Sequence, residues 1–287
     1  MTDSSRTGSA LPAVRDVVDA LDRRYPRSWA EEWDHVGLVL GDFDCTVEKV
    51  LCVVDCVPET VDQALAVGAN LIVTHHPLLL KPVSSVAPDT YKGRIIHRLI
   101  RADVALYAAH TNADVANPGV SDALAARLDL LNLRPLVPAE GAGEGGGRGI
   151  GRIGVLAAPM VLDEFVGYCA RKLPPTSGGV RAACDPERMV RTVAVCGGAG
   201  DQFLPHATAA GVDAYVCADL RHHPASEHVA AGGPALIDVA HWASERPWLD
   251  DVAEWLRGQF PVEAIVSDLD TDPWTVHAVS PLKELLK

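Results

Sequence analysis

Short apolar runs alternate with helical segments along most of this chain, and that alternation constrains the fold more than any other feature. Lys49–Cys56 (KVLCVVDC) is apolar on both faces, as expected of a central parallel strand. Pro58–Val67 predicts a helix that ends at Gly68, and Asn70–Thr74 predicts the next strand. Such alternation is typical of an α/β fold with a largely parallel sheet.

The same pattern continues to the end of the chain. Further strands are predicted at Val104–Ala109, Arg152–Leu156, Arg191–Cys196, Ala214–Ala218, Ala235–Ala240, Val262–Ser267 and Trp274–Val279. Helices are predicted at Tyr91–Arg101 and Leu162–Leu173, and from about Ser121, Gln202 and Ser244 onwards.

The length of 287 residues favours two domains over one. The glycine-rich segment Glu140–Gly149 (EGAGEGGGRG) is typical of a flexible loop. We therefore expect a first α/β half at 1–134, a linker loop at 135–150 and a second α/β half at 151–287. Each half should be of three-layer type with a mixed, largely parallel sheet, and the last strands could return to the first half.

The overall charge limits the classes of partner. A net charge of -13 argues against a protein that binds nucleic acid through its phosphate backbone. No stretch approaches the roughly 20 apolar residues of a membrane span, and the polar first ten residues lack a signal core. The seven scattered cysteines contain no Cys-x-x-Cys pair and indicate unpaired thiols in a reducing compartment. We expect a cytoplasmic protein with no membrane or nucleic-acid partner.

Metal-binding residue types follow three of the predicted strands, where α/β folds place functional groups. His75 and His76 come directly after NLIVT. Neighbouring strand residues point to opposite faces, so this pair suits two ions side by side better than one. The alternative is a solvated or hydrogen-bonded pair of histidines.

The second and third strand ends add carboxylates. HTNAD, His110 to Asp114, follows VALYAA, although taken alone it is more often a polar turn. His241 follows ALIDVA, and Glu245 comes four residues later near a helix start, where the helix dipole favours a carboxylate. The alternative for this pair is a capping acid beside a surface histidine.

Together these residues predict a two-metal centre in the cleft between the halves. Imidazole and carboxylate ligands suit Zn, Fe, Mn, Co or Ni. Three histidines and two acids are too few for two closed structural sites, but they suffice for two open ions that share Glu245 and retain water. The expected metal ligands are His75, His76, Asp114, His241 and Glu245.

Three further features allow two interpretations each. His110 is either a catalytic proton shuttle near the ions or a residue that stabilises a turn. His222 and His223 either enter the same cleft or lie on a surface helix. Gly197–Gly200 either binds an anion through its backbone amides or forms a tight turn, and it lacks the lysine of a phosphate-binding loop.

A set of motifs resembles one known family over most of the chain, from Trp33 to Pro273. EWDHVG, LIVTHHPLL, AAHTNAD, IGRIG, VAVCGGAGD, ADLRHH and HWASE occur in the order seen in the Nif-three-like superfamily, whose members bear the name GTP cyclohydrolase I type 2 homologue. The sequence departs from the family at His35, where asparagine is usual, and in CADL, where TGDL is usual. Longer relatives also insert a domain where this chain has only the glycine-rich loop.

The resemblance implies a ligand assignment and an assembly. One ion would be held by His75, Asp114 and Glu245, and the other by His76, His241 and Glu245. The family's usual assembly is a toroidal homohexamer.

These expectations favour a metal-dependent hydrolase, a cyclohydrolase or phosphohydrolase acting on a small, nucleotide-like substrate. The link to GTP comes only from the resemblance, because a fold does not fix a substrate. The alternatives are a non-catalytic metal carrier and a ring-shaped scaffold whose metals are structural.

Overall fold

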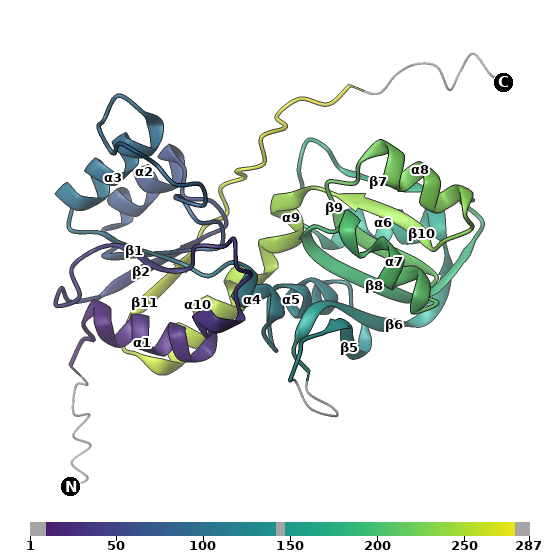
Figure 1. Ribbon diagram of the computed structural model, residues 1–287, viewed down its shortest axis with the longest axis horizontal. Coiled ribbons are helices and arrows are strands. Elements are labelled where there is room, and N and C mark those ends of the chain that lie inside the picture. Colours follow the sequence, from purple (N-terminus) through teal and green to yellow (C-terminus); the bar gives the residue numbers. More distant parts are fainter. Residues whose placement is uncertain (1–9, 142–146, 279–287) are drawn as a thin grey trace, which may run out of the picture. The chain divides into compact units, whose positions relative to one another are not determined.

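The computed structural model describes residues 10–141 and 147–278 (Figure 1). The predictions for the polar N-terminal segment, for the middle of the glycine-rich loop and for Val279 fall outside the described residues. The chain forms two compact units. Unit 1 takes in the described residues up to Gly119 together with Trp248–Leu269, and unit 2 takes in Val120–Pro247 and the described residues from Asp270. The division into two independently folding halves at residues 135–150 stays a prediction.

Unit 1 is built on a five-stranded sheet with the order β1-β4-β3-β2-β11. The strands are β1 (Gly37–Leu40), β2 (Lys49–Val53), β3 (Leu71–Thr74), β4 (Ala105–Ala108) and β11 (Glu263–Val266). All neighbours are parallel except β1, which runs antiparallel to β4. Thr74 pairs with both Val53 and Ala108, so the carboxyl ends of β2, β3 and β4 are level. The residues that follow these three strands are therefore gathered at one edge.

Helices cover both faces of this sheet (Figure 1). The helices of this unit are α1 (Val14–Arg24), α2 (Pro58–Val67), α3 (Tyr91–Arg101), α4 (Thr111–Val115) and α10 (Pro247–Gln259), with a 3-10 turn at Arg27–Trp29. Leu51, Ile72 and Leu106 pack with the buried residues of α2 and α3. Successive strand residues alternate between the two faces of a sheet, and α1 and α10 cover the other face (Figure 1).

Unit 2 contains a six-stranded sheet with the order β5-β6-β8-β9-β10-β7. The strands are β5 (Leu131–Pro138), β6 (Gly149–Val161), β7 (Val180–Ala183), β8 (Met189–Ala199), β9 (Ala214–Ala218) and β10 (Ala235–Val239). The central strands β8, β9 and β10 are parallel, and the outer pairings are antiparallel. The prediction of an α/β chain with mixed sheets is confirmed.

The helices of unit 2 also lie on both faces of its sheet. They are α5 (Val120–Arg127), α6 (Leu162–Lys172), α7 (Leu204–Ala209), α8 (His222–Ala230) and α9 (His241–Glu245), with a 3-10 turn at Asp201–Phe203. Val195, Val216 and Ile237 pack in one core cluster with α5 and α6. Tyr215 and Leu236 face the opposite cluster, which includes residues of α7 and α8. Both units thus have three layers.

Several local predictions are wrong. Gly197 to Ala199 continue β8 instead of forming a tight turn. Residues 274–278, the described part of the predicted strand Trp274–Val279, form no strand. In addition, α1, β1, β5 and β7 have no counterpart among the predicted elements.

All seven cysteines lie among the described residues, and no disulfide joins any of them. Within the part of the chain that the structure describes, no helix combines the length and apolar character that crossing a bilayer requires.

Candidate metal centre

In unit 1, the backbone holds His75 and His76 at the end of β3. Their amides donate to the carbonyl oxygens of Val53 and Val54, at 3.1 and 2.9 Å. Thr74 Oγ1 also donates to Val54 O, at 2.9 Å. His75 is fully buried, and the centroids of the two imidazole rings are 5.0 Å apart. The strand end thus fixes two adjacent imidazoles side by side.

Both rings are oriented through Nδ1. His75 Nδ1 lies 2.9 Å from Ala109 O, and His76 Nδ1 lies 2.7 Å from Asp55 Oδ1. Both partners are hydrogen-bond acceptors, so Nδ1 must carry the proton in each ring. The second nitrogen, Nε2, then has a lone pair that can bind a metal ion, which is how histidine ligands are commonly held in proteins.

Asp114 faces His75 across a distance suited to an ion. Its Oδ1 lies 3.7 Å from His75 Nε2, which is longer than a hydrogen bond. Two nitrogen or oxygen ligands of one zinc-like ion lie roughly 3 to 3.6 Å apart, because each is about 2.0–2.2 Å from the metal. Asp114 is placed by α4, where its amide donates to His110 O at 3.0 Å. The donor set therefore suits a divalent metal, and the distance between the two atoms lies just above this range.

His110 precedes α4 and is paired with a buried aspartate. Its Nδ1 lies 3.0 Å from Asp34 Oδ1, while Asp34 Oδ2 accepts hydrogen bonds from Thr111 N at 3.0 Å and Thr111 Oγ1 at 2.5 Å. Burial raises the pKa of Asp34, but the hydrogen bonds from His110 and Thr111 outweigh it and hold the pKa well below its usual value. An ionised Asp34 thus keeps the Nδ1 proton on His110 and leaves Nε2 to accept one.

The histidines of unit 1 that were singled out from the sequence form one cluster. Nitrogens of His75, His76 and His110 all lie within 4.8 Å of one another. The structure therefore brings His110, the predicted catalytic residue, together with His75 and His76, and Asp114 lies beside His75.

Unit 2 carries the other two predicted ligands on one short helix. His241 and Glu245 are four residues apart on α9 and so share a face, with His241 Nε2 3.0 Å from Glu245 Oε1. His241 Nδ1 lies 2.7 Å from Asp219 Oδ2, directly after β9. Burial lowers the pKa of His241, but Glu245 and Asp219 outweigh it and raise the pKa to about 11. A divalent cation bound at Nε2 in place of a proton would face the Glu245 carboxylate, while Asp219 contacts Nδ1 of the same ring.

Gly198 allows β8 to approach this pair closely. Its φ is +69°, and a Cβ there would lie 2.3 Å from Glu245 Oε1 and 3.1 Å from His241 Nε2. Gly198 N donates to Ser244 Oγ at 2.8 Å, and Ser244 Oγ donates to His241 O at 2.7 Å. Gly198, one of the glycines that the sequence suggested for a tight turn or an anion site, thus makes room for Glu245.

The residues that orient the imidazoles are absent from the set predicted from the sequence. Asp55 and Asp219 each follow a strand, β2 and β9, so the rule that pointed to the histidines could have found them as well. Asp34 and Gly198 lie within the family motifs, but only the fold shows their contacts.

His222 and His223 lie on a surface helix, the second of their two interpretations. They begin α8, both are exposed, and their ring centroids are 5.1 Å apart. His222 also lines a cavity of about 440 Å³ with Arg181 and Asp238.

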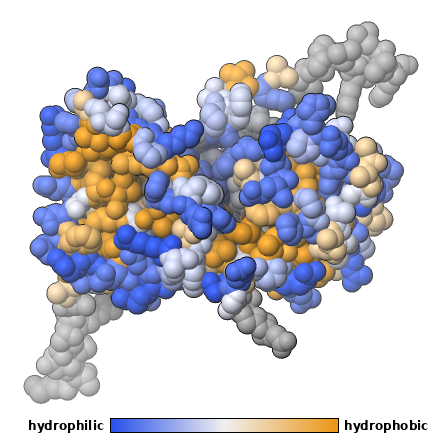
Figure 2. All heavy atoms as spheres, in the orientation of Figure 1, coloured by the Kyte–Doolittle hydropathy of each residue, from blue (hydrophilic) through white to orange (hydrophobic). Residues whose placement is uncertain are grey.

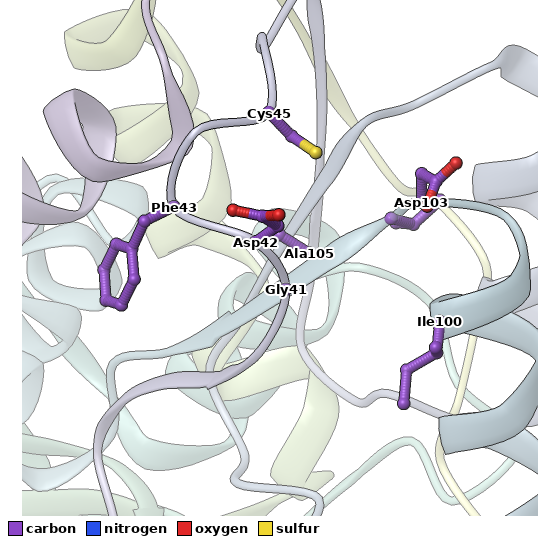
Figure 3. A pocket seen from close by; sticks show the side chains of 8 residues that line it. Gly41, Asp42, Phe43, Cys45, Ile100, Asp103 and Ala105 are labelled. Carbon is purple, nitrogen blue, oxygen red and sulfur yellow. The ribbon is translucent and has the colours of Figure 1, made fainter.

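A further cavity, in unit 1, lies away from the predicted ligands (Figure 3). Its volume is about 480 Å³, and it is lined by residues that include Gly41, Phe43, Ile100 and Ala105. Ala105 begins β4, whereas His110 follows the other end of that strand. This cavity is therefore separate from the candidate centre.

Comparison with known proteins agrees with the motifs. Residues 12–273 match the model of one family, described as Duf34/NIF3 (NGG1p interacting factor 3). The chain belongs to the NIF3 family. The resemblance drawn from the motifs is thereby confirmed.

Relatives of this NIF3-family chain share most of their length with it. A GTP cyclohydrolase 1 type 2 homolog of Streptomyces coelicolor is 50% identical over 277 residues, covering 94% of this chain and 96% of the relative. A protein of the same name from Mycobacterium tuberculosis is 39% identical over 370 residues, covering 92% and 97%. The crystal structure of a Bacillus cereus protein related to NIF3 matches with a TM-score of 0.86 at 26% identity, covering 94% of this chain and 100% of that one. These matches establish the family and the fold.

Proposed function

We propose that this protein is a dinuclear metal-dependent hydrolase of the cyclohydrolase or phosphohydrolase type, acting on a small, nucleotide-like substrate in the cytoplasm. One observation carries the proposal. All three predicted histidine ligands direct Nδ1 to an oxygen acceptor, which leaves Nε2 of each ring as the donor towards a metal. The names of the relatives support the cyclohydrolase type, and the ligand chemistry supports hydrolysis.

The proposed ligand assignment follows the family resemblance. His75, Asp114 and Glu245 would hold one ion, and His76, His241 and Glu245 would hold the other. The ions are divalent and drawn from Zn, Fe, Mn, Co and Ni, because imidazole and carboxylate donors suit all of these metals.

The protein's own residues supply the proton transfers. Divalent ions held by these residues would supply Lewis-acid chemistry, which activates an electrophile and lowers the pKa of water towards neutral pH. His110 accepts a proton at Nε2 and returns it to the leaving group, while Asp34 holds the ring in that tautomer. Asp34 can do this because its side chain is fully buried, and the His110 side chain is only 14% exposed.

The alternatives are a non-catalytic metal carrier and a scaffold with structural metals. Both would need the same five ligands, but neither needs a histidine that exchanges protons beside them. The His110–Asp34 pair therefore favours the hydrolase.

The test combines metal analysis with a substrate screen. Metal content of the purified protein is measured alongside hydrolysis of a panel of nucleotides and phosphoesters. Replacing His110 with Gln should leave the bound metal unchanged and lower turnover by about 10²- to 10⁴-fold. Replacing His76 with Ala should lower the bound metal itself.

The matched control is His222→Gln, which removes an exposed imidazole on α8. It should change neither metal content nor turnover. Metal-loaded protein that hydrolyses nothing in the panel, or His110→Gln with full turnover, would exclude the proposed role of His110 and favour the carrier.

A further inference from the structure

An exposed tryptophan stands beside the candidate catalytic histidine. Trp33 is 57% exposed, and its ring centroid lies 5.8 Å from that of His110 with an interplanar angle of 79°. An exposed indole is not by itself a binding site. Its position relative to His110 is what matters here.

The segment that carries Trp33 is pinned to the start of α4. Glu31 N donates to Thr111 Oγ1 at 3.0 Å, and the Asp34 carboxylate accepts from the amide and hydroxyl of the same threonine. Asp34 N also donates to Glu31 O at 2.9 Å, closing a turn around Trp33. The backbone on both sides of Trp33 is thus fixed to the residue that follows His110.

Behind His110 lie the imidazole rings of two predicted metal ligands. The His110 ring centroid lies 5.1 Å from that of His75 and 5.5 Å from that of His76. A flat molecule lying on the indole would therefore have an edge beside His110, the residue assigned to proton transfer, and would be close to two predicted metal ligands.

The charges near Trp33 limit the kind of molecule that could lie on its indole. The neighbours of Trp33 in sequence include the exposed Glu31 and Glu32. Carboxylates repel a phosphate, whereas they can accept hydrogen bonds from the N–H groups of an uncharged heterocycle. We propose, building on the hydrolase function above, that Trp33 is a stacking platform for the neutral heterocycle of the substrate, such as a purine base, and that the phosphate of a nucleotide lies elsewhere.

The test uses guanosine, which has the base without a phosphate, and ribose 5-phosphate, which has the phosphate without a base. Binding of each to the metal-loaded full-length protein is measured by equilibrium dialysis. Stacking of one base on an aromatic side chain corresponds to a roughly 5- to 150-fold change in dissociation constant. Trp33→Leu should weaken guanosine binding by that factor, and Trp33→Phe should weaken it only about threefold, since a smaller ring remains. Ribose 5-phosphate should bind all variants equally.

Trp274→Leu is the matched control, because it also removes an exposed indole, one that is 72% exposed. It should leave guanosine binding unchanged. Metal content and light-scattering mass are recorded for every variant, so that a folding defect or an altered assembly is detected.

Four outcomes would overturn the inference. Two concern Trp33→Leu: unchanged guanosine binding, and an equal loss of ribose 5-phosphate binding. The third is a wild type that shows no saturable guanosine binding. The fourth is a changed mass in Trp33→Leu, which would mean that a second copy of the chain covers the indole. The hydrolase proposal fails separately. Guanosine binding that depends on Trp33, without any turnover, would refute the hydrolase proposal and support the stacking role of Trp33. Turnover of a phosphoester that lacks a ring, with unchanged guanosine binding in Trp33→Leu, would support the hydrolase proposal and refute the stacking role.

Discussion

At the scale of single residues, the same contact recurs in both units. His76 Nδ1 and His241 Nδ1 each lie 2.7 Å from an aspartate oxygen, of Asp55 and Asp219 respectively. Such carboxylates fix the tautomer and raise the basicity of the ligating nitrogen, and their loss typically lowers metal affinity about 10- to 100-fold. We expect Asp55→Asn to show a loss in this range, measured by competition with a chromophoric chelator.

The control for this substitution is Asp62→Asn. Asp62 lies on α2 and its largely exposed carboxylate pairs with Arg98, so its loss should not alter metal affinity. If Asp55→Asn binds metal as tightly as Asp62→Asn does, then Asp55 does not support a metal ligand.

A second residue-scale prediction concerns Gly198. Its alanine variant would suffer backbone strain at φ +69° and a contact of 2.3 Å between the new Cβ and Glu245 Oε1. Gly211 has a similar φ of +65°, but nothing lies within 4 Å of the position that a methyl group would take there. Both alanine variants should lose about 1–2 kcal/mol from backbone strain. Only Gly198→Ala should lose bound metal as well, because only there is the Glu245 carboxylate displaced.

Denaturant unfolding measures the loss of stability in the two glycine variants, and metal analysis measures their bound metal. Equal metal content in both would show that Glu245 tolerates the methyl group and that Gly198 matters only for its backbone.

At the scale of elements, the sequence predicted best those strands that are buried on both faces. β9 has the predicted bounds, Ala214–Ala218, and all five of its residues are buried. β3 and β10 differ from their predictions by one residue each. A continuous apolar run is a strong signal because both faces of a central strand contact helices.

Two of the strands without a prediction, β5 and β7, are less buried. β7 has no buried residue, and β5 has one in eight. Such edge strands are specified by pairing with a neighbour, which a local apolar pattern does not reveal. The candidate ligands were easier to find than the edges of the sheets, because the ligands follow central strands.

One motif of the family resemblance has a structural role at this scale. Arg152, in IGRIG, is 1% exposed and joins β6 to α5 through two bonds to Asp122, at 2.7 and 2.6 Å. Removing one partner of a buried ion pair leaves the other charge buried without compensation, which lowers the free energy of unfolding by about 3–5 kcal/mol. We expect Asp122→Ala to lower the free energy of unfolding by that amount in a urea titration.

The control is Asp129→Ala, whose carboxylate pairs with Lys172 at the surface and should contribute less than about 1 kcal/mol. The double variant Asp122→Leu with Arg152→Leu should recover much of the loss, since it leaves no buried charge. An Asp122→Ala variant as stable as Asp129→Ala would contradict this account.

At the scale of the whole molecule, we expect a homo-oligomer larger than a dimer, with the hexamer as the proposed form. Figure 2 shows hydrophobic residues gathered on the face of unit 1 where Figure 1 labels β1. Among the exposed apolar side chains of this unit are Phe43 and Ile100, at 44% and 57% exposure. Large exposed apolar patches mark interaction sites in soluble proteins. Light scattering should give several times the 30.5 kDa mass of one chain, and a mass near 30.5 kDa would contradict the prediction.

The second prediction at this scale concerns metal removal. Three of the proposed ligands (His75, His76, Asp114) belong to unit 1 and two (His241, Glu245) to unit 2. If all five serve one two-metal centre, neither unit can complete it alone, and the ions bind only when both contribute. A ligand that binds only the assembled state stabilises it by mass action, by about 2.7 kcal/mol at 100 times its dissociation constant. Removing the ions with a chelator should therefore lower the melting temperature.

The same removal should loosen the strand ends that carry the ligands and leave the two cores intact. Each core has its own cluster of fully buried apolar side chains, such as Leu51 and Ile72 in unit 1 and Val195 and Val216 in unit 2, which needs no metal to pack. Hydrogen exchange of the metal-free and metal-loaded protein separates the possibilities. Faster exchange confined to the segments around His75 and His241 supports the shared centre. Faster exchange spread evenly over both units would make the metal structural and favour the scaffold, and identical exchange in both forms would mean that these segments hold no metal.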